Sequence, residues 1–352
     1  MLWLDMFVPR FRVKSRQHRA EGGAAVILRL RISCTILRRC SEGDTRRDSA
    51  CDTRRMEKID DLAALIARHA RADGAVETAI KGLGLLRSSA ETEPVHTLYE
   101  PSCCIVAQGR KRAVVGGRAY QYDPSNYLIV GLDLPVIGAV IEASVAQPYL
   151  SVRLPLNRQA LADMLMHDST KPGRGDARGS PAIAVEAATP HLIDAATRLL
   201  HLLDTPDDIP ALAPLIEREI LYRLLRGPHA DMLRQVAYLT GRINRIQRAI
   251  AFIRHHYTED FAIDALAALA DMSVSTFHAQ FKVATHMSPL RFRAQIRLQE
   301  ARRLMLAEGL GAAEAGFRVG YESPSQFSRE YGRLFNTPPK RDTATRKALA
   351  SA

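Results

Sequence analysis

Residues 262–282 read AIDALAALADMSVSTFHAQFK, and residues 311–335 read GAAEAGFRVGYESPSQFSREYGRLF. Each stretch begins with a short run of helix-forming residues, passes through a turn, and continues with aromatic residues four positions apart. This pattern is typical of a helix-turn-helix unit, whose second helix lies in the DNA major groove. Because the pattern occurs twice, the sequence predicts a module that enters the major groove at two places.

The second helix of the first unit is expected to have one buried face and one outward face. Phe277, Phe281 and Ala284 are spaced i, i+4, i+7 and form the predicted buried stripe. Ser275, Ala279 and Lys282 follow the same spacing on the other side of the helix. The predicted DNA-facing residues are therefore Ser275, Thr276, His278, Ala279 and Lys282. For His278, a surface position that never meets DNA fits the pattern equally well.

In the second unit the same spacing predicts a buried stripe of Phe327, Tyr331 and Leu334. The predicted DNA-facing residues are Ser325, Gln326, Arg329 and Arg333. Arg329 is the strongest candidate for a base contact, because a guanidinium can donate two parallel hydrogen bonds to guanine; the alternative is a solvated surface arginine. Ser275 and Ser325 lie near helix starts, where a serine binds phosphate or caps the helix.

A long helix is predicted between the two units, over residues 289–307. Its apolar stripe is expected to consist of Leu290, Ala294, Leu298, Ala301 and Met305. About 20 residues at ~1.5 Å each give a rod of about 30 Å, close to the ~34 Å of one turn of B-DNA. Such a connector would place two recognition helices in successive major grooves. The alternative is a core helix with no spacing role.

The charge distribution separates the chain into parts. Residues 242–352 contain 17 Lys and Arg against 10 Asp and Glu, whereas residues 56–241 contain 19 against 22. A basic part joined to an acidic part fits a DNA-binding module joined to a sensor module. The expected segments are an N-terminal extension over 1–55, a sensor and dimerisation domain over 56–240, a tandem helix-turn-helix domain over 241–342, and a tail over 343–352.

The first 55 residues lack the regular patterning that begins at Met56, where an apolar stripe at helical spacing starts. We interpret Met56 as the natural start of the protein and the preceding stretch as an over-extended reading frame. A disordered basic arm is the alternative.

Residues 95–156 have the pattern of several short strands at close spacing, over 103–108, 112–115, 118–122, 127–130, 135–141 and 149–156. The pair Gly116-Gly117 predicts a tight hairpin, because glycine adopts the positive φ angles that such a turn needs. These strands predict a small barrel or sandwich. Asn157 is expected to cap a helix over 158–167, and a flexible loop is expected over 171–181. All later elements are predicted to be helical, over 190–203, 209–226, 229–239 and 243–257.

The run YESPSQFSREYGRLFNTPP at 321–339 closely resembles the signature of AraC-type transcriptional regulators. The runs MSVSTFH at 272–278, MSPL at 287–290 and RLQEARRLM at 297–305 are similar to the same family, so the resemblance covers roughly residues 243–341. Residues 57–165 resemble the cupin-like N-terminal domain of these regulators, through YEPS at 99–102, AQGRKR at 107–112, YDPSNY at 122–127 and LDLPV at 132–136.

The resemblance implies an α+β protein with an N-terminal cupin-like β-barrel and helices, followed by an all-α double helix-turn-helix domain. It implies that positions 275, 278 and 279 face bases in one groove, and positions 325, 326 and 329 face bases in the next. Ala279 departs from the family pattern, because this position often carries a large polar or basic residue. Its methyl group donates no hydrogen bond, so the first unit is expected to discriminate less than the second.

A small-molecule effector is expected in the N-terminal domain, with Tyr99, Arg110, Arg112, Tyr122 and Tyr127 as candidate contacts. The alternative is a domain that only packs against a partner. Half of such residues should point to solvent, because side chains alternate along a strand. Helices between residues 190 and 226 carry apolar residues that fit pairing in a homodimer and packing within one chain equally well. The expected partners are double-stranded DNA, RNA polymerase and the effector.

The sequence argues against an enzyme. A metal-dependent cupin enzyme needs several histidines and a glutamate on its strands, but His96 is the only histidine between residues 95 and 156. The five cysteines have no metal-ligand spacing, and no catalytic triad, phosphate loop or dinucleotide fingerprint is present. We therefore expect no catalytic residues, no metal, no cofactor and no membrane segment, and a cytoplasmic transcription regulator. The alternative is an architectural DNA-binding protein without effector control.

Overall fold

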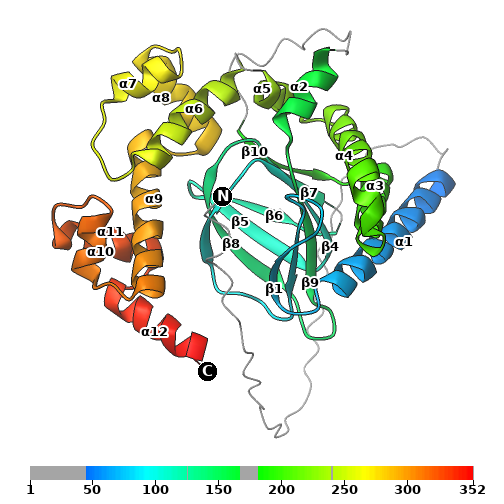
Figure 1. Ribbon diagram of the computed structural model, residues 1–352, viewed down its shortest axis with the longest axis horizontal. Coiled ribbons are helices and arrows are strands. Elements are labelled where there is room, and N and C mark those ends of the chain that lie inside the picture. The colour runs from blue at the N-terminus through cyan, green and yellow to red at the C-terminus, as the bar shows by residue number, and fades with distance from the viewer. Residues whose placement is uncertain (1–44, 125, 167–180, 239–240, 352) are drawn as a thin grey trace, which may run out of the picture.

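The computed structural model describes residues 45–124, 126–166, 181–238 and 241–351 (Figure 1). The predictions for residues 1–44 and for nearly all of the loop at 171–181 lie outside the described residues. Helix α1, Thr45–His69, extends across the predicted boundary at residue 56. All described strands lie before residue 188, and only helices follow residue 241. The predicted α+β class with an all-helical C-terminal part is confirmed.

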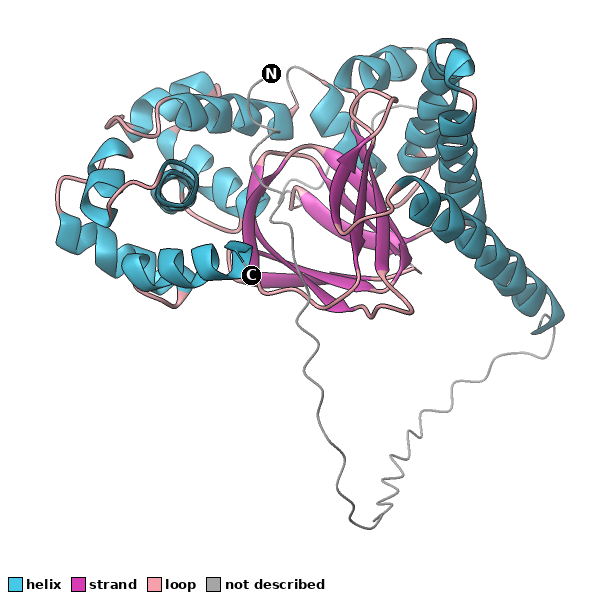
Figure 2. Cartoon of the chain, turned by 60° about the horizontal axis from the view of Figure 1, so that its bottom comes forward, coloured by secondary structure: helices cyan, strands magenta, loops and turns pink. Residues whose placement is uncertain are grey.

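The strands form two antiparallel sheets (Figure 2). The six-stranded sheet has the order β1-β2-β9-β4-β7-β10, and the four-stranded sheet has the order β3-β8-β5-β6. Among the described strands no ladder joins the two sheets, so they do not close into the single barrel that the resemblance implied. The bounds are β1 Gly74–Glu77, β2 Gly84–Ser88, β3 Val95–Tyr99, β4 Ser102–Gln108, β5 Arg110–Val115, β6 Arg118–Tyr122, β7 Asn126–Val130, β8 Leu134–Glu142, β9 Tyr149–Pro155 and β10 Ile183–Ala187.

The six strands expected between residues 103 and 156 are all present, whereas β1, β2, β3 and β10 were not predicted. Strand β10 corrects the expectation that every element after residue 181 is helical. Its five residues carry little pattern of their own, and pairing with the distant β7, with Ile183 opposite Val130, determines their conformation. The predicted glycine hairpin is confirmed between β5 and β6, where Gly116 and Gly117 have φ angles of 60° and 93°.

Three helices cover the outer face of the six-stranded sheet: α1, α3 (Pro190–His201) and α4 (Ile209–Leu225) (Figure 1). Their apolar residues Leu192, Leu199 and Ile220 are at most 2% exposed within the single chain. Packing within the chain, one of the two interpretations of these helices, therefore accounts for their apolar stripes. Two shorter helices, α2 (Arg158–Met166) and α5 (Ala230–Ala237), complete this part. Asn157 caps α2 as predicted, since its Oδ1 accepts from the Ala160 amide at 3.0 Å.

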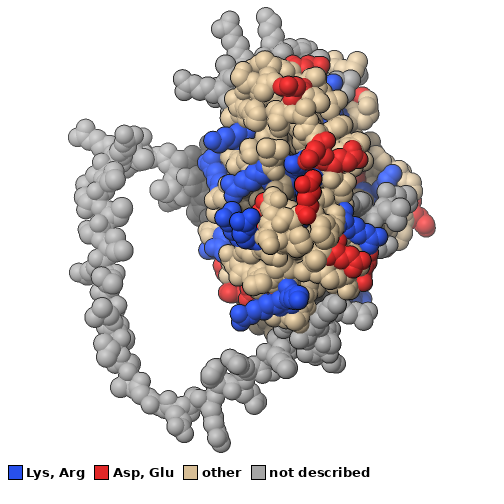
Figure 3. All heavy atoms as spheres, turned by 90° about the vertical axis from the view of Figure 1, so that its left-hand side faces the viewer, with Lys and Arg blue, Asp and Glu red and all other residues tan. Residues whose placement is uncertain are grey.

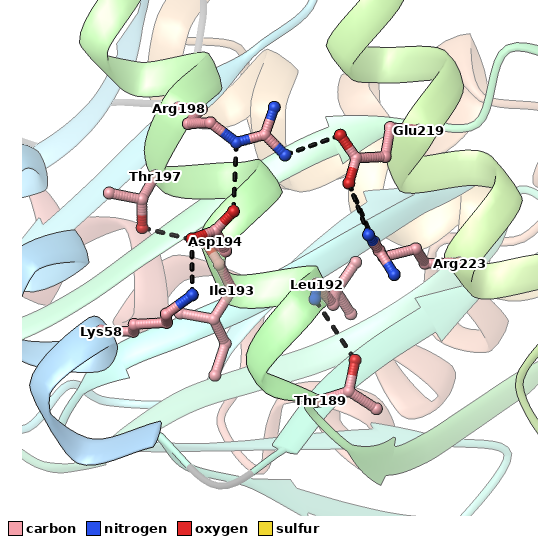
Figure 4. Close-up of polar contacts among 9 residues, drawn as sticks. All are labelled: Lys58, Thr189, Leu192, Ile193, Asp194, Thr197, Arg198, Glu219 and Arg223. Atoms are coloured by element: carbon pink, nitrogen blue, oxygen red, sulfur yellow. Dashed lines mark hydrogen bonds and ion pairs between the residues drawn. The ribbon is translucent and has the colours of Figure 1, made fainter. Parts of the chain in front are cut away.

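A chain of ion pairs ties these helices together at the surface (Figure 4). Lys58 on α1 donates to Asp194 on α3 at 2.5 Å, and Arg198 joins Asp194 to Glu219 on α4. Hydrogen bonds from Lys58 and Arg198 outweigh burial and lower the pKa of Asp194. Each exposed pair contributes about 0–1 kcal/mol, so the network fixes helix register more than it supplies stability.

The C-terminal helices are α6 Arg242–His255, α7 Ile263–Leu269, α8 Val274–Thr285, α9 Pro289–Arg303, α10 Ala312–Arg318, α11 Pro324–Phe335 and α12 Pro339–Ser351. They contact the sheets at several points. Asp133 binds Gln247 and Arg254 of α6, and Tyr120 on β6 shares a 2.7 Å hydrogen bond with His286, just after α8. None of the described helices combines the length and apolar character needed to cross a membrane.

Candidate nucleic-acid interface

In the first unit, α7 and α8 meet in a tight turn. Asp271 has a positive φ of 49°, and the Met272 amide donates back to the Ala267 carbonyl at 3.0 Å. Helix α8 then begins after Ser273, whose Oγ accepts from the Thr276 amide at 3.3 Å. The predicted buried stripe is confirmed, because Phe277, Phe281 and Ala284 are all 0% exposed.

The second unit repeats this geometry about 50 residues later. Gly320 has a φ of 92°, the Tyr321 amide donates to the Gly316 carbonyl at 2.9 Å, and Ser323 Oγ accepts from the Gln326 amide at 3.4 Å. Both recognition helices end in a left-handed residue, His286 after α8 and Asn336 after α11. The two units seen in the sequence thus share the same turn between their helices, the same serine cap and the same left-handed residue at the end of the recognition helix.

The buried face of α11 differs slightly from the prediction. Phe327 and Tyr331 are fully buried, but Leu334 is only partly buried at the edge of the second core. The neighbouring Phe335 takes up part of this contact, with its ring centroid 4.3 Å from that of Tyr331. The caps also correct an expectation: they are Ser273 and Ser323, so the capping interpretation of Ser275 and Ser325 is wrong.

The predicted DNA-facing side chains are all exposed, namely Ser275, Thr276, His278, Ala279 and Lys282 on α8 and Ser325, Gln326, Arg329 and Arg333 on α11. Three of them have partners within their own unit: Ser275 and Thr276 both bond Ser273, and Gln326 donates to Glu330 at 3.0 Å. Lys282, Arg329 and Arg333 differ, because no described carboxylate lies within 4.0 Å of their charged groups. These three cations are therefore available to an anionic partner.

Helix α9 lies between the two units and continues as a π-helical turn over Leu304–Glu308. Its predicted apolar stripe is partly wrong, since Leu290 is 50% exposed and Ala294 is only partly buried. Both units pack on α9, so its buried positions are not confined to one stripe. Phe292 and Ile296 belong to the first core, and Leu298, Ala301 and Met305 belong to the second.

Buried charged residues on α9, which the sequence analysis missed, fix the second unit. Arg302 donates two hydrogen bonds to Asp342 at the start of α12, at 2.7 and 2.8 Å, and Tyr331 donates to the same carboxylate at 2.7 Å. Although burial opposes it, bonding to Arg302 and Tyr331 lowers the pKa of Asp342. The network ties α9, α11 and α12 together at neutral pH.

Figure 3 shows the side of the molecule on which the helix-turn-helix units lie. Lys and Arg side chains gather along one edge of this face, and Asp and Glu lie mainly beside them rather than among them. A basic edge of this kind would attract the phosphate backbone without covering the whole face.

The structure does not bring the five candidate effector contacts together. Tyr122 is buried and Tyr99 is half-buried, both on the inner side of the four-stranded sheet, whereas Arg110 and Arg112 are exposed. Tyr127 is buried, but its hydroxyl lies toward Gly227 at the end of α4, outside the space between the sheets. Strand register decides these positions, and the sequence pattern alone did not fix it.

Comparison with known proteins gives matches over both parts. A family model described as the N-terminus of AraC-type transcriptional regulators matches residues 79–232, and a helix-turn-helix domain model matches residues 266–344. The transcriptional activator RhaS of Salmonella schwarzengrund is 29% identical over 136 residues, which is 38% of this chain and 46% of RhaS. The chain thus spans about half the length of the curated relatives it matches.

Two solved structures are also similar. ToxT from Vibrio cholerae O395 aligns over 77% of this chain and 98% of its own, with 10% identity and a TM-score of 0.45. The DNA-binding domain of AdpA in complex with a target DNA aligns over 30% of this chain and 94% of its own, with 28% identity and a TM-score of 0.28. From the two family models, which together match about two thirds of the sequence, the chain belongs to the AraC family of transcriptional regulators.

Proposed function

We propose that the protein is a sequence-specific transcription regulator that places α8 and α11 in successive major grooves of one DNA site. The observation that carries this proposal is the repeated geometry of the two units, each with an outward recognition face, on opposite parts of one rigid connector. Helix α9 and its π-helical turn include 20 residues, Pro289–Glu308, or about 30 Å. This length suits one turn of B-DNA, ~34 Å.

In this proposal Arg329 reads a base, and Ser275, Thr276, His278, Ser325 and Gln326 line the two grooves beside it. Lys282 and Arg333 supply phosphate contacts at the sides of the recognition helices. Because Arg329 makes no ion pair with the described residues, its planar fork can meet guanine without breaking an existing contact.

The N-terminal domain is proposed to bind a small effector and to control the DNA-binding helices. The hydrogen bond between Tyr120 and His286, and the backbone hydrogen bond from the Ala182 amide to the Ala284 carbonyl at 3.1 Å, support this coupling, because both reach the end of α8. RNA polymerase is the proposed protein partner, with activation as the proposed outcome. Exposed Leu212, Leu215 and Tyr222 on α4 support a homodimer through that helix.

Salt titration of binding to preferred and random DNA tests sequence specificity. We expect the preferred site to bind at least about 1000-fold more tightly than random DNA at physiological salt, with both affinities falling as salt rises. An architectural protein, the second candidate function, would bind both with nearly equal affinity, and that result would contradict the proposal.

A gain of DNA affinity is expected when Ala279 on α8, whose methyl group donates no hydrogen bond, is replaced by arginine. Ala279→Arg adds a cation and five donors on the exposed groove face, so we expect affinity for the preferred site to rise roughly tenfold in fluorescence anisotropy. Ala146→Arg, on the exposed loop between β8 and β9, is the matched control and should leave binding unchanged. Unchanged binding by Ala279→Arg would mean that residue 279 does not face the groove.

A further inference from the structure

Six polar side chains meet in the space between the two sheets. Tyr99, Lys111 and Tyr122 come from strands β3, β5 and β6 of the four-stranded sheet. The other three, Cys104, Tyr149 and Ser151, come from strands β4 and β9 of the six-stranded sheet. We call these six residues the inner polar cluster.

Lys111 is the centre of the inner polar cluster. Its Nζ lies 5.6 Å from the centroid of the Tyr99 ring and 5.9 Å from that of Tyr149, and Tyr122 is its partner across the β5–β6 ladder. Within the described part of the chain, no Asp or Glu oxygen lies within 4.0 Å of this ammonium. Its exposed neighbours on the same strand behave differently: Arg110, for example, pairs with Asp123 and Glu142.

The hydroxyl groups of the inner polar cluster can donate hydrogen bonds, but no negatively charged acceptor is among the six residues. The hydroxyls of Tyr99, Tyr122 and Tyr149 are buried, and none completes a hydrogen bond of good geometry with the described residues. Burial raises the pKa of Tyr122 and of Tyr149 well above the usual value, and it also raises the pKa of Cys104. At neutral pH these groups are therefore protonated and uncharged.

Lys111 itself keeps its charge. Burial opposes the ammonium, but its interaction with the Tyr99 side chain, which includes a hydrogen bond, helps to outweigh burial and raises the pKa of Lys111 above its usual value. One buried cation surrounded by protonated hydroxyls is costly on its own, because neither the charge nor the hydroxyls have full partners. An anion with two or three acceptor oxygens would pair with the Lys111 ammonium and accept hydrogen bonds from the hydroxyls at the same time.

Three members of the inner polar cluster are not fully buried. Tyr99, Cys104 and Lys111 lie between the sheets, yet each retains some exposed surface. Gly138 on β8, the strand between β3 and β5, lets two members of the cluster pack closely against its backbone. A Cβ at that position would lie 3.0 Å from the Tyr99 hydroxyl and 3.5 Å from Cε of Lys111.

The rest of the wall is apolar. Ala113 and Val115 follow Lys111 on the inner side of β5, and Val136 and Val140 flank Gly138 on β8; all are at most 3% exposed. A polar end that binds anions beside an apolar wall fits a ligand with one charged group and a hydrocarbon body.

We propose that the inner polar cluster binds the carboxylate of a small organic acid, with Lys111 as its counterion and Tyr99, Tyr122 and Tyr149 as hydrogen-bond donors. This inference names the effector class, and so it rests on the proposed function. Strand β6 connects the site to the DNA-binding helices, since it carries Tyr122 in the cluster and, two residues earlier, Tyr120, which bonds His286.

Thermal unfolding of the full chain tests the proposal. The probes are hexanoate, decanoate, benzoate and salicylate, each compared with its uncharged primary amide. At a concentration about 100 times the dissociation constant, we expect at least one carboxylate to raise Tm by roughly 5 °C, and its amide to leave Tm unchanged. If none of the four carboxylates raises the Tm of the unmodified chain, the proposal is overturned.

Three variants test where the carboxylate binds. Lys111→Met removes the cation and keeps an apolar chain of similar length, so its unliganded Tm should be equal or higher and the carboxylate shift should disappear. Arg112→Met removes the same charge from the exposed face of β5 and should retain the full shift. Gly138→Val places a Cβ 3.0 Å from the Tyr99 hydroxyl, so it displaces one of the proposed donors and should also abolish the shift. An equal shift in Lys111→Met and in the unmodified chain would contradict the assignment.

DNA affinity of the same preparations, measured without any acid, distinguishes a failure of the proposed carboxylate site from a failure of the proposed DNA-binding function. Strong, sequence-selective DNA binding with no carboxylate shift would overturn only the ligand site. A carboxylate shift with no selective DNA binding would support the site and contradict the proposed function.

Discussion

Replacing Phe327 with alanine is expected to unfold the second helix-turn-helix unit while leaving the rest of the molecule folded. The Phe327 side chain is 0% exposed, and its ring lies 5.4 Å from that of Tyr321 and 5.5 Å from that of Tyr331. Helix α10 approaches so closely that a Cβ on Gly316 would lie 2.9 Å from the Phe327 ring. Removing a buried phenyl group costs about 3–5 kcal/mol, which is large for so small a core.

The loss should be local because the second core is separate from the first. Leu298, Ala301 and Met305 of α9 belong to the second core with Phe327, whereas the sheets and α8 share the first. Hydrogen exchange should therefore accelerate in α10, α11 and α12 and stay slow in the sheets. Phe317→Ala on α10 is the matched control, since Phe317 is 53% exposed, and it should change exchange little. Uniform acceleration across the whole chain would show that the two cores are one cooperative unit.

The second large effect is expected on sequence preference. Arg329→Ala should lower discrimination at one base position of the preferred site by about 1–3 kcal/mol, or roughly 5- to 150-fold, because a bidentate contact with guanine would be lost. Competition among DNA duplexes that differ only at single base pairs measures this change directly.

Arg318→Ala provides the control for Arg329. Arg318 is an exposed arginine of the same unit, but Glu308 holds its guanidinium at 3.0 Å, so its removal should leave base preference intact. If Arg329→Ala weakens binding to every duplex by the same factor, Arg329 contacts phosphate, and the assignment of base reading to this residue is wrong.

The parts of the structure that depend on local spacing could be predicted from the sequence. Phe277, Phe281 and Phe327 repeat at the helical period, so their burial follows from the pattern alone. The Gly116-Gly117 turn was equally predictable, because few other residue pairs adopt two consecutive positive φ angles.

The features that depend on contacts between distant segments were missed. Leu290 fits an apolar stripe but is 50% exposed, because the two units bury different faces of α9. Each observed cap lies two residues before the candidate position, at Ser273 rather than Ser275 and at Ser323 rather than Ser325. Several serines near each helix start fit the same pattern, so the sequence did not distinguish them.

The residues of the inner polar cluster were also missed in part, because their placement depends on how distant strands pair. Sequence reasoning selected Arg110 and Arg112, but the side chain between them, Lys111, is the one that points inward. A shift of one residue in strand register reverses every side chain, and no sequence pattern fixed that register. A lysine flanked by two arginines in a strand beside tyrosine-rich strands is the signal that could have indicated this site.

Hydroxyl-radical footprinting on a preferred DNA site measures how many grooves the protein occupies. Helices α8 and α11 on the connector α9 predict two protected stretches on one face of the duplex, about 10 base pairs apart from centre to centre. A single short protected stretch, with only one recognition helix in contact, would contradict the proposed two-groove binding.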